Sequence, residues 1–98
     1  MKERKFEHGQ IVMTKAVAEE VERSRTFSIF IGDCLIRHLC GDWGDDLTAE
    51  DVETNQYALK NGGRLFSAYI FRQEEDIKVW IITEGDRSVT TILFPSDY

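Results

Sequence analysis

The chain has few cysteines and no long apolar run, and each shortage excludes a class of protein. No segment approaches the roughly 18 consecutive apolar residues that suggest a membrane span. The first residues, Met-Lys-Glu-Arg-Lys-Phe-Glu-His-Gly, lack the apolar stretch of a secretory signal peptide, so we expect a cytoplasmic protein. The composition, 42% hydrophobic, favours one globular domain over residues 1–98, with 1–7 expected to fray.

Cys34 and Cys40 are the only cysteines, and both fall in one apolar segment. If that segment is a helix, six residues place the two thiols about 9 Å apart along its axis, which is beyond disulfide reach. His38 is the one histidine nearby, and three such side chains at this spacing make a poor zinc site. We therefore expect reduced thiols, no metal and no cofactor.

Basic charge is also scarce. The formal net charge is −6, and residues 41–61 hold six Asp and Glu against one Lys. Contact with phosphates needs a basic face, so this balance disfavours duplex DNA as a partner and leaves RNA possible as one. An acidic DNA mimic that inhibits a nucleic-acid-binding host system is one alternative, although a surplus of this size is ordinary for a soluble domain.

Three helices are predicted. Thr14 precedes a short one over about 15–23, and an apolar stripe at three- and four-residue spacings predicts a second over about 27–40. The third has the clearest start, because Thr48 and Asp51 resemble a capping box and Leu47 and Val52 form a hydrophobic staple. It should end at Asn-Gly-Gly, residues 61–63.

Four runs rich in β-branched and aromatic residues predict strands over residues 9–13, 65–71, 77–83 and 89–94. Short polar breaks separate the last three, which favours an antiparallel meander that Pro95 ends. We therefore expect an α+β domain of two layers, with three helices packed on one face of a three- or four-stranded antiparallel sheet.

Three phrases carry a resemblance: residues 38–45 (His-Leu-Cys-Gly-Asp-Trp-Gly-Asp), 61–69 (Asn-Gly-Gly-Arg-Leu-Phe-Ser-Ala-Tyr) and 80–88 (Trp-Ile-Ile-Thr-Glu-Gly-Asp-Arg-Ser), running on to Pro95 and Tyr98. Over roughly residues 38–98 the chain resembles a family of small uncharacterised bacterial proteins usually labelled plasmid-related, found on mobile elements. The resemblance implies a compact bacterial protein encoded on accessory DNA. It implies no activity.

The element order is also similar to that of small ribonuclease toxins of the RelE and barnase-like class, which need no metal. Such chemistry requires a base, cations at the phosphate and hydroxyl donors. His38 is the candidate base, Arg64 and Arg87 are the candidate cations, and Tyr69 and Thr91 are candidate donors. Each has a structural alternative: a histidine near a helix end favours the helix dipole, and surface arginines commonly pair with nearby carboxylates.

The leading hypothesis is a non-enzymatic accessory protein of a mobile element that binds another protein. Aromatic and arginine residues are typical anchors at protein interfaces. Two polar loops carry such residues, and the predicted contact surface consists of Trp43, Asp45, Arg64, Asp86 and Arg87. Trp43 is also expected to fold back over the edge of the core, since an indole left in water would lose its burial.

Overall fold

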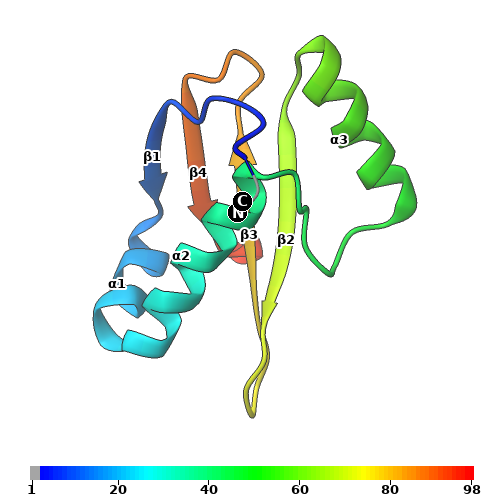
Figure 1. Cartoon of the computed structure of the whole chain (residues 1–98). Helices are drawn as coiled ribbons and strands as arrows, with labels where there is room; N and C mark the ends of the chain where they lie inside the picture. The colour runs from blue at the N-terminus through cyan, green and yellow to red at the C-terminus, as the bar shows by residue number, and fades with distance from the viewer. Residues whose placement is uncertain (1–2) are drawn as a thin grey trace.

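Four strands form one sheet in the order β1-β4-β3-β2, and three helices pack around it (Figure 1). The structure, a computed structural model, describes residues 3–98. The combination of one sheet with three helices confirms the predicted α+β class. The elements are β1 (Gln10–Met13), α1 (Lys15–Arg23), α2 (Arg25–Leu39), α3 (Ala49–Asn61), β2 (Leu65–Phe71), β3 (Ile77–Thr83), β4 (Val89–Leu93) and the 3-10 turn η1 (Pro95–Asp97).

Helix starts follow the local sequence signals. The side chain of Thr14 accepts a hydrogen bond from the Val17 N–H, and Ser24 accepts one from Phe27, so each satisfies a donor that the helix itself leaves unpaired. At α3 the Thr48 and Asp51 side chains bond reciprocally to each other's backbone N–H. The predicted capping box is therefore confirmed.

The sheet is mixed, which corrects the expectation of a purely antiparallel one. Strands β2, β3 and β4 form the predicted antiparallel meander, but β1 pairs with β4 in parallel. The N–H of Gln10 donates to the carbonyl of Ser88, so β1 begins beside the start of β4 and both run the same way. Gly9 makes this entry possible, because its φ is +63° and a Cβ there would lie 2.2 Å from the Ser88 oxygen.

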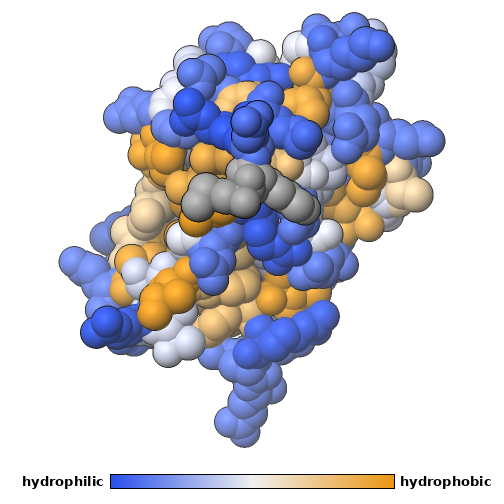
Figure 2. All heavy atoms as spheres, viewed as in Figure 1, coloured by the Kyte–Doolittle hydropathy of each residue, from blue (hydrophilic) through white to orange (hydrophobic). Residues whose placement is uncertain are grey.

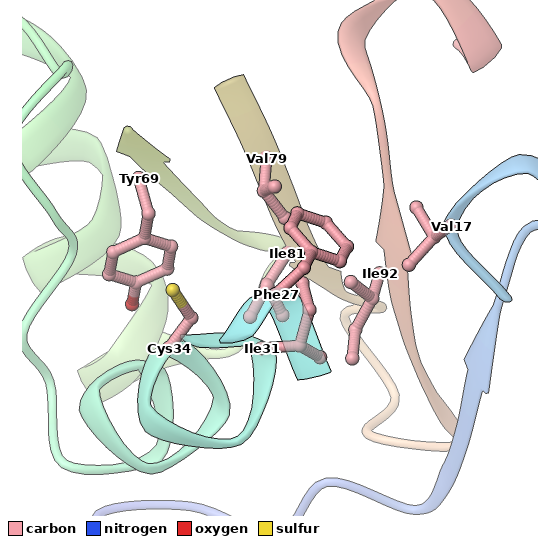
Figure 3. Packing of buried hydrophobic residues seen from close by; sticks show 8 residues of the cluster. All are labelled: Val17, Phe27, Ile31, Cys34, Tyr69, Val79, Ile81 and Ile92. Atoms are coloured by element: carbon pink, nitrogen blue, oxygen red, sulfur yellow. The ribbon is translucent and has the colours of Figure 1, made fainter. Parts of the chain in front are cut away.

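Helices α1 and α2 cover one face of the sheet; in Figure 1, α2 lies in front of β4 and β3, and α1 lies at the lower left, below β1. The register places alternate strand residues on that face, and they meet the apolar stripes of the helices. Figure 3 shows the resulting core: Val17, Phe27, Ile31, Cys34, Tyr69, Val79, Ile81 and Ile92.

Helix α3 does not join that layer, which corrects the expectation of three helices on one face. It lies beside β2, at the right of Figure 1. The buried Asn55 side chain donates to the carbonyl of Phe66 at 2.6 Å and accepts from the Phe66 N–H at 3.0 Å. An amide thus pairs with strand backbone as a neighbouring strand would. We call this outer side of β2 the closed edge.

The loop before α3 completes the closed edge. The Ala68 N–H donates to the Trp43 carbonyl, and the Asp45 N–H donates to the Ala68 carbonyl. Gly44 allows this approach, since its φ is +95° and a Cβ there would lie 2.0 Å from the Ala68 oxygen. Loop and helix together therefore pair the outward backbone groups of two successive outward-facing positions of β2, Phe66 and Ala68.

The segment before β1 is held on the molecule. The Lys5 N–H donates to the Leu39 carbonyl at 2.7 Å, and the Phe6 ring contacts those of His38 and Trp43. Phe6 thereby closes a small second apolar cluster within the segment 1–7 that the sequence led us to expect to fray. Residues 1–2 of that expectation lie outside the described residues.

The surface mixes charged and apolar residues, and Figure 2 shows hydrophobic side chains reaching it between charged ones on the side of α1 and α2. The turn between β2 and β3 projects from the body as a hydrophilic tip (Figures 1 and 2). Among residues 3–98, no helix combines the length and apolarity that crossing a membrane requires.

Candidate functional site

The predicted base, His38, lies at the centre of a buried hydrogen-bonded chain. Its Nδ1 is 2.5 Å from the Ser67 hydroxyl and its Nε2 is 2.9 Å from that of Thr83. The Thr83 hydroxyl lies 2.7 Å from that of Thr90, which donates to the carbonyl of His8. All four side chains are fully buried.

The carbonyl of His8 at the end of this hydrogen-bonded series determines which group donates in each of its bonds. Because the Thr90 hydroxyl donates to a carbonyl, it accepts from Thr83, whose oxygen must then accept from the Nε2–H of His38. Nδ1 is left as the acceptor for the Ser67 hydroxyl. His38 is therefore assigned as neutral, with its proton on Nε2.

Burial also makes His38 a poor base. Desolvation, with a smaller contribution from the nearby Arg87 charge, lowers the pKa of His38 to about 3. Its ring is 0% exposed, so no substrate oxygen reaches it. The geometry supports a structural histidine that ties α2 to three strands rather than a general base.

Tyr69, a predicted donor, is likewise engaged inside the protein. Its hydroxyl donates to the Asp42 carbonyl at 2.6 Å, and burial raises its pKa. The Arg37 guanidinium lies over the Tyr69 ring, 4.9 Å from its centre, and pairs with the carboxylates of Asp42 and Asp45. The hydrogen bond to Asp42, above all, raises the pKa of Arg37, so this guanidinium stays charged.

Two members of the predicted contact surface, Trp43 and Arg87, face the interior. Trp43 is 5% exposed and packs against Phe6, His38, Ala58 and Leu65, as its expected return to the core requires. Within residues 3–98, its Nε1 has no hydrogen-bond acceptor. A partner could meet only the edge of this indole.

The Arg87 guanidinium joins two loops. It donates to the Gly63 carbonyl at 2.6 Å and to the Ala58 carbonyl, in the last turn of α3, at 3.1 Å. It also lies over the Phe6 ring. Arg87 adopts the left-handed conformation, with φ of 63°, a strain that these contacts offset. A cation held in this way stabilises the helix end and is not available to bind a phosphate.

Arg64, Asp45 and Asp86 are the predicted contact residues that stay at the surface. Arg64 donates to the Tyr98 hydroxyl at 2.9 Å and pairs with Glu84 at 3.3 Å, which raises the pKa of Arg64. Asp86 accepts from the hydroxyl and the N–H of Ser88, and these bonds lower its pKa. Asp86 therefore caps its own turn, as aspartates in such turns commonly do.

Thr91 is separated from the other predicted catalytic residues by the sheet itself. His38 packs on the side of Thr90, whereas Thr91, the next residue of β4, points to the opposite side. The candidate residues for ribonuclease chemistry therefore do not converge. A concavity of about 800 Å³ exists elsewhere, and none of them lines it: its walls are Glu3, Arg4, Lys5, Cys40, Gly41 and Leu59.

The side of the sheet to which Thr91 points is a candidate contact surface that the sequence did not lead us to predict. Among residues 3–98 none of the α-helices α1, α2 and α3 covers it, whereas the 3-10 turn η1 and Tyr98 cover part of it. The register aligns its side chains in rows across the strands. We call this surface the helix-free face; its members are Val12, Phe66, Ala68, Ile70, Lys78, Trp80, Ile82, Thr91 and Leu93.

Aromatic rings dominate this face. The Trp80 ring contacts that of Phe66 at 5.1 Å and that of Tyr98 at 5.8 Å between centres, both edge to face. A sheet covered on one face normally alternates apolar and polar residues, whereas here both faces are apolar. The run Val-Trp-Ile-Ile over residues 79–82 is the signal in the sequence that could have shown this.

Comparisons with protein-family models, with curated proteins and with solved structures each found no match to this chain.

Proposed function

We propose that this protein is a non-enzymatic domain that binds another protein through its helix-free face. The observation that carries the proposal is the group of half-buried apolar side chains around Trp80, which includes Phe66 and Ile70, where a solvated sheet face would carry polar residues. Ala68, Ile82 and Leu93 lie buried between them. Tryptophan and tyrosine at the centre of a patch are the residues that most often supply binding energy at protein interfaces.

The rim of the face fits a protein partner better than a nucleic acid. Its cations are already paired, Arg64 with Glu84 and Lys78 with Asp46 at 3.1 Å. A strand of RNA stacking on the aromatic rings would need unpaired positive charge beside them. A polar rim of paired charges around an apolar centre is typical of protein interfaces.

The alternatives find less support in the geometry. A ribonuclease would need His38 exposed, and it is buried. A DNA mimic would need an array of unpaired carboxylates, but Asp42 and Asp45 pair with Arg37, and Asp46 with Lys78. From the resemblance over residues 38–98 we further propose that the protein is encoded on a bacterial mobile element and that its partner is a cytoplasmic bacterial protein.

A photo-crosslinking residue placed at Lys78, on the face, tests the proposal in living cells. We expect one protein to be captured there and not from Tyr57, which is 70% exposed on α3 and serves as the control. The captured protein, once purified, should bind the wild type and lose at least about tenfold in affinity for Thr91→Arg. Equal capture at both positions, or equal binding by both proteins, would place the contact elsewhere.

A further inference from the structure

The two edges of the sheet are treated differently, and the difference lies in β1. The β1 backbone bonds to β4 through alternate residues, since Gln10 donates to Ser88 and Thr14 donates to Ile92. In a parallel ladder the residues between, Ile11 and Met13, direct their N–H and C=O groups to the other side. Within residues 3–98 no segment pairs with that side, which we call the open edge.

The side chains of the open edge are apolar as well. Ile11 is 37% and Met13 is 39% exposed, and Figure 2 shows hydrophobic surface at the left margin, where Figure 1 places β1. The residues from Gly9 to Thr14 carry no charge. Sheet edges are usually protected by lysine, by proline, by a covering segment or by the shortness of the edge strand. With four residues β1 is short, but in the part of the chain that the structure describes it carries no lysine or proline and no segment covers it.

We infer that two copies of this chain associate through the open edge, with their β1 strands antiparallel about a two-fold axis at Val12. In this register Ile11 of each copy lies opposite Met13 of the other. The outward groups of these residues then form four hydrogen bonds, and the two copies make one continuous eight-stranded sheet.

The fit of β1 to itself favours a second copy over an extended segment of another protein. The strand has four residues and turns at once into α1, while the chain before Gly9 leaves the edge to pack at α2. A longer foreign strand would extend past both ends, whereas a second β1 ends where the first does. Opposite residues share a face in an antiparallel pair, so Ile11 would cover Met13, and Lys15 would meet the uncharged Gly9.

A charge exchange at the open edge tests the register. Sedimentation equilibrium of the wild type should show reversible association to twice the chain mass of 11.4 kDa. Ile11→Lys/Met13→Lys and Ile11→Glu/Met13→Glu should each be monomeric, because like charges would lie opposite each other. An equimolar mixture of the two should form dimers again, which also shows that both variants are folded.

A cysteine placed on the axis tests the same contact by chemistry. Residues opposite each other without mutual hydrogen bonds have Cα atoms about 4.5 Å apart, within disulfide range. In a Cys40→Ser background, Val12→Cys should therefore form a disulfide-linked dimer under mild oxidation, at least about tenfold faster than Tyr57→Cys.

Several results would overturn the inference. One is a wild type that stays monomeric at every concentration while Val12→Cys crosslinks no faster than the control. Another is a dimer that survives both charged variants and is lost in Ile29→Ser/Ile36→Ser, since these exposed residues of α2 would then form the interface. A third is capture of a foreign extended segment by β1 in a protein that never self-associates.

Discussion

The closed edge at β2 and the open edge at β1 show two ways in which a small sheet ends. At β2, an asparagine from a helix and the backbone of a loop occupy the outward groups of Phe66 and Ala68. At β1, no segment within residues 3–98 covers the corresponding groups of Ile11 and Met13. The closed edge requires a whole helix, a glycine-dependent loop and an arginine at the helix end, so leaving β1 without any of them suggests a use for it.

A buried series of hydrogen bonds connects the two edges. The hydrogen-bonded chain through His38 begins at Ser67 in β2 and ends at the His8 carbonyl, two residues before β1. Buried polar groups that are fully paired fix one arrangement of the parts they join. The hydrogen-bonded series through His38 therefore fixes the position of one edge of the sheet relative to the other.

The strongest test of the closed edge is Asn55→Leu. The substitution leaves the N–H and C=O of Phe66 unpaired at a buried site, so we expect the free energy of unfolding to fall by about 3 kcal/mol. Urea melts would measure the loss. The control is Asn61→Ala, which removes only an exposed bond to Tyr57 and should cost less than about 0.5 kcal/mol. Similar melts for the two variants would mean that Asn55 does not close the edge.

Arg87→Ala should have the next largest effect. It removes the bonds to the Gly63 and Ala58 carbonyls and loosens the end of α3, at a cost of about 2 kcal/mol in the free energy of unfolding. Arg87→Lys should recover only part of this, because one ammonium cannot reproduce the planar fork. Arg72→Ala, which breaks an exposed ion pair with Asp76, is the matched control and should cost almost nothing. If Arg87→Ala leaves the free energy of unfolding unchanged, these bonds do not hold the end of α3, and Arg87 is again a candidate contact residue.

Because the buried hydrogen bonds of His38 need its neutral form, we expect the free energy of unfolding to depend on pH. The pKa of His38 is about 3 when folded and about 6.5 when unfolded, so below pH 6.5 the unfolded chain binds the additional proton. The contribution of neutral His38 is complete above that pH and is lost as the pH falls. Stability should drop by up to about 1.4 kcal/mol per pH unit between pH 6 and 4.5, above the range in which most carboxylates titrate.

Two variants separate this effect from other titrations. His38→Gln should abolish most of the slope in urea melts at a series of pH values, whereas His8→Gln, at the half-buried second histidine, should retain it. If both variants keep the slope of the wild type, protonation of His38 does not control the stability of the link.

The sequence predicted the parts of this fold that local rules determine. Thr14, Thr48 and Asp51 mark helix starts because caps act within three residues, and the meander follows from short turns between β-rich runs. The parallel pairing of β1 was not predictable in this way, since its partner β4 lies more than seventy residues along the chain. Such pairing depends on the path of the whole chain.

Site prediction had a similar limit. His38, Tyr69 and Arg87 have the side chains that catalysis uses, but pattern alone does not reveal that all three bond to internal groups. Asn55 gave no signal, because a single asparagine in a helix has no period to recognise. The helix-free face could have been predicted from the unbroken apolar run in β3. Such a run places apolar side chains on both faces of the sheet, whereas the expected single layer of helices covers only one face.

The smallest expected effect is at the start of the helix that closes β2. Thr48→Ala removes the side-chain half of the capping box and should lower the free energy of unfolding by about 1 kcal/mol. The core variant Ile81→Ala should cost more, about 2–5 kcal/mol, because a fully buried side chain leaves a cavity. Thr54→Ala, on the exposed side of the same helix, should be neutral or slightly stabilising.

The order of these three variants in urea is the measurement. If Thr48→Ala costs as much as Ile81→Ala, the start of α3 supports more than its own first turn, and closing the edge depends on the cap as well as on Asn55. If Thr48→Ala matches Thr54→Ala, the cap adds nothing. The anchoring of α3 beside β2 then rests on the paired amide of Asn55 and on the Arg87 contacts at the other end of the helix.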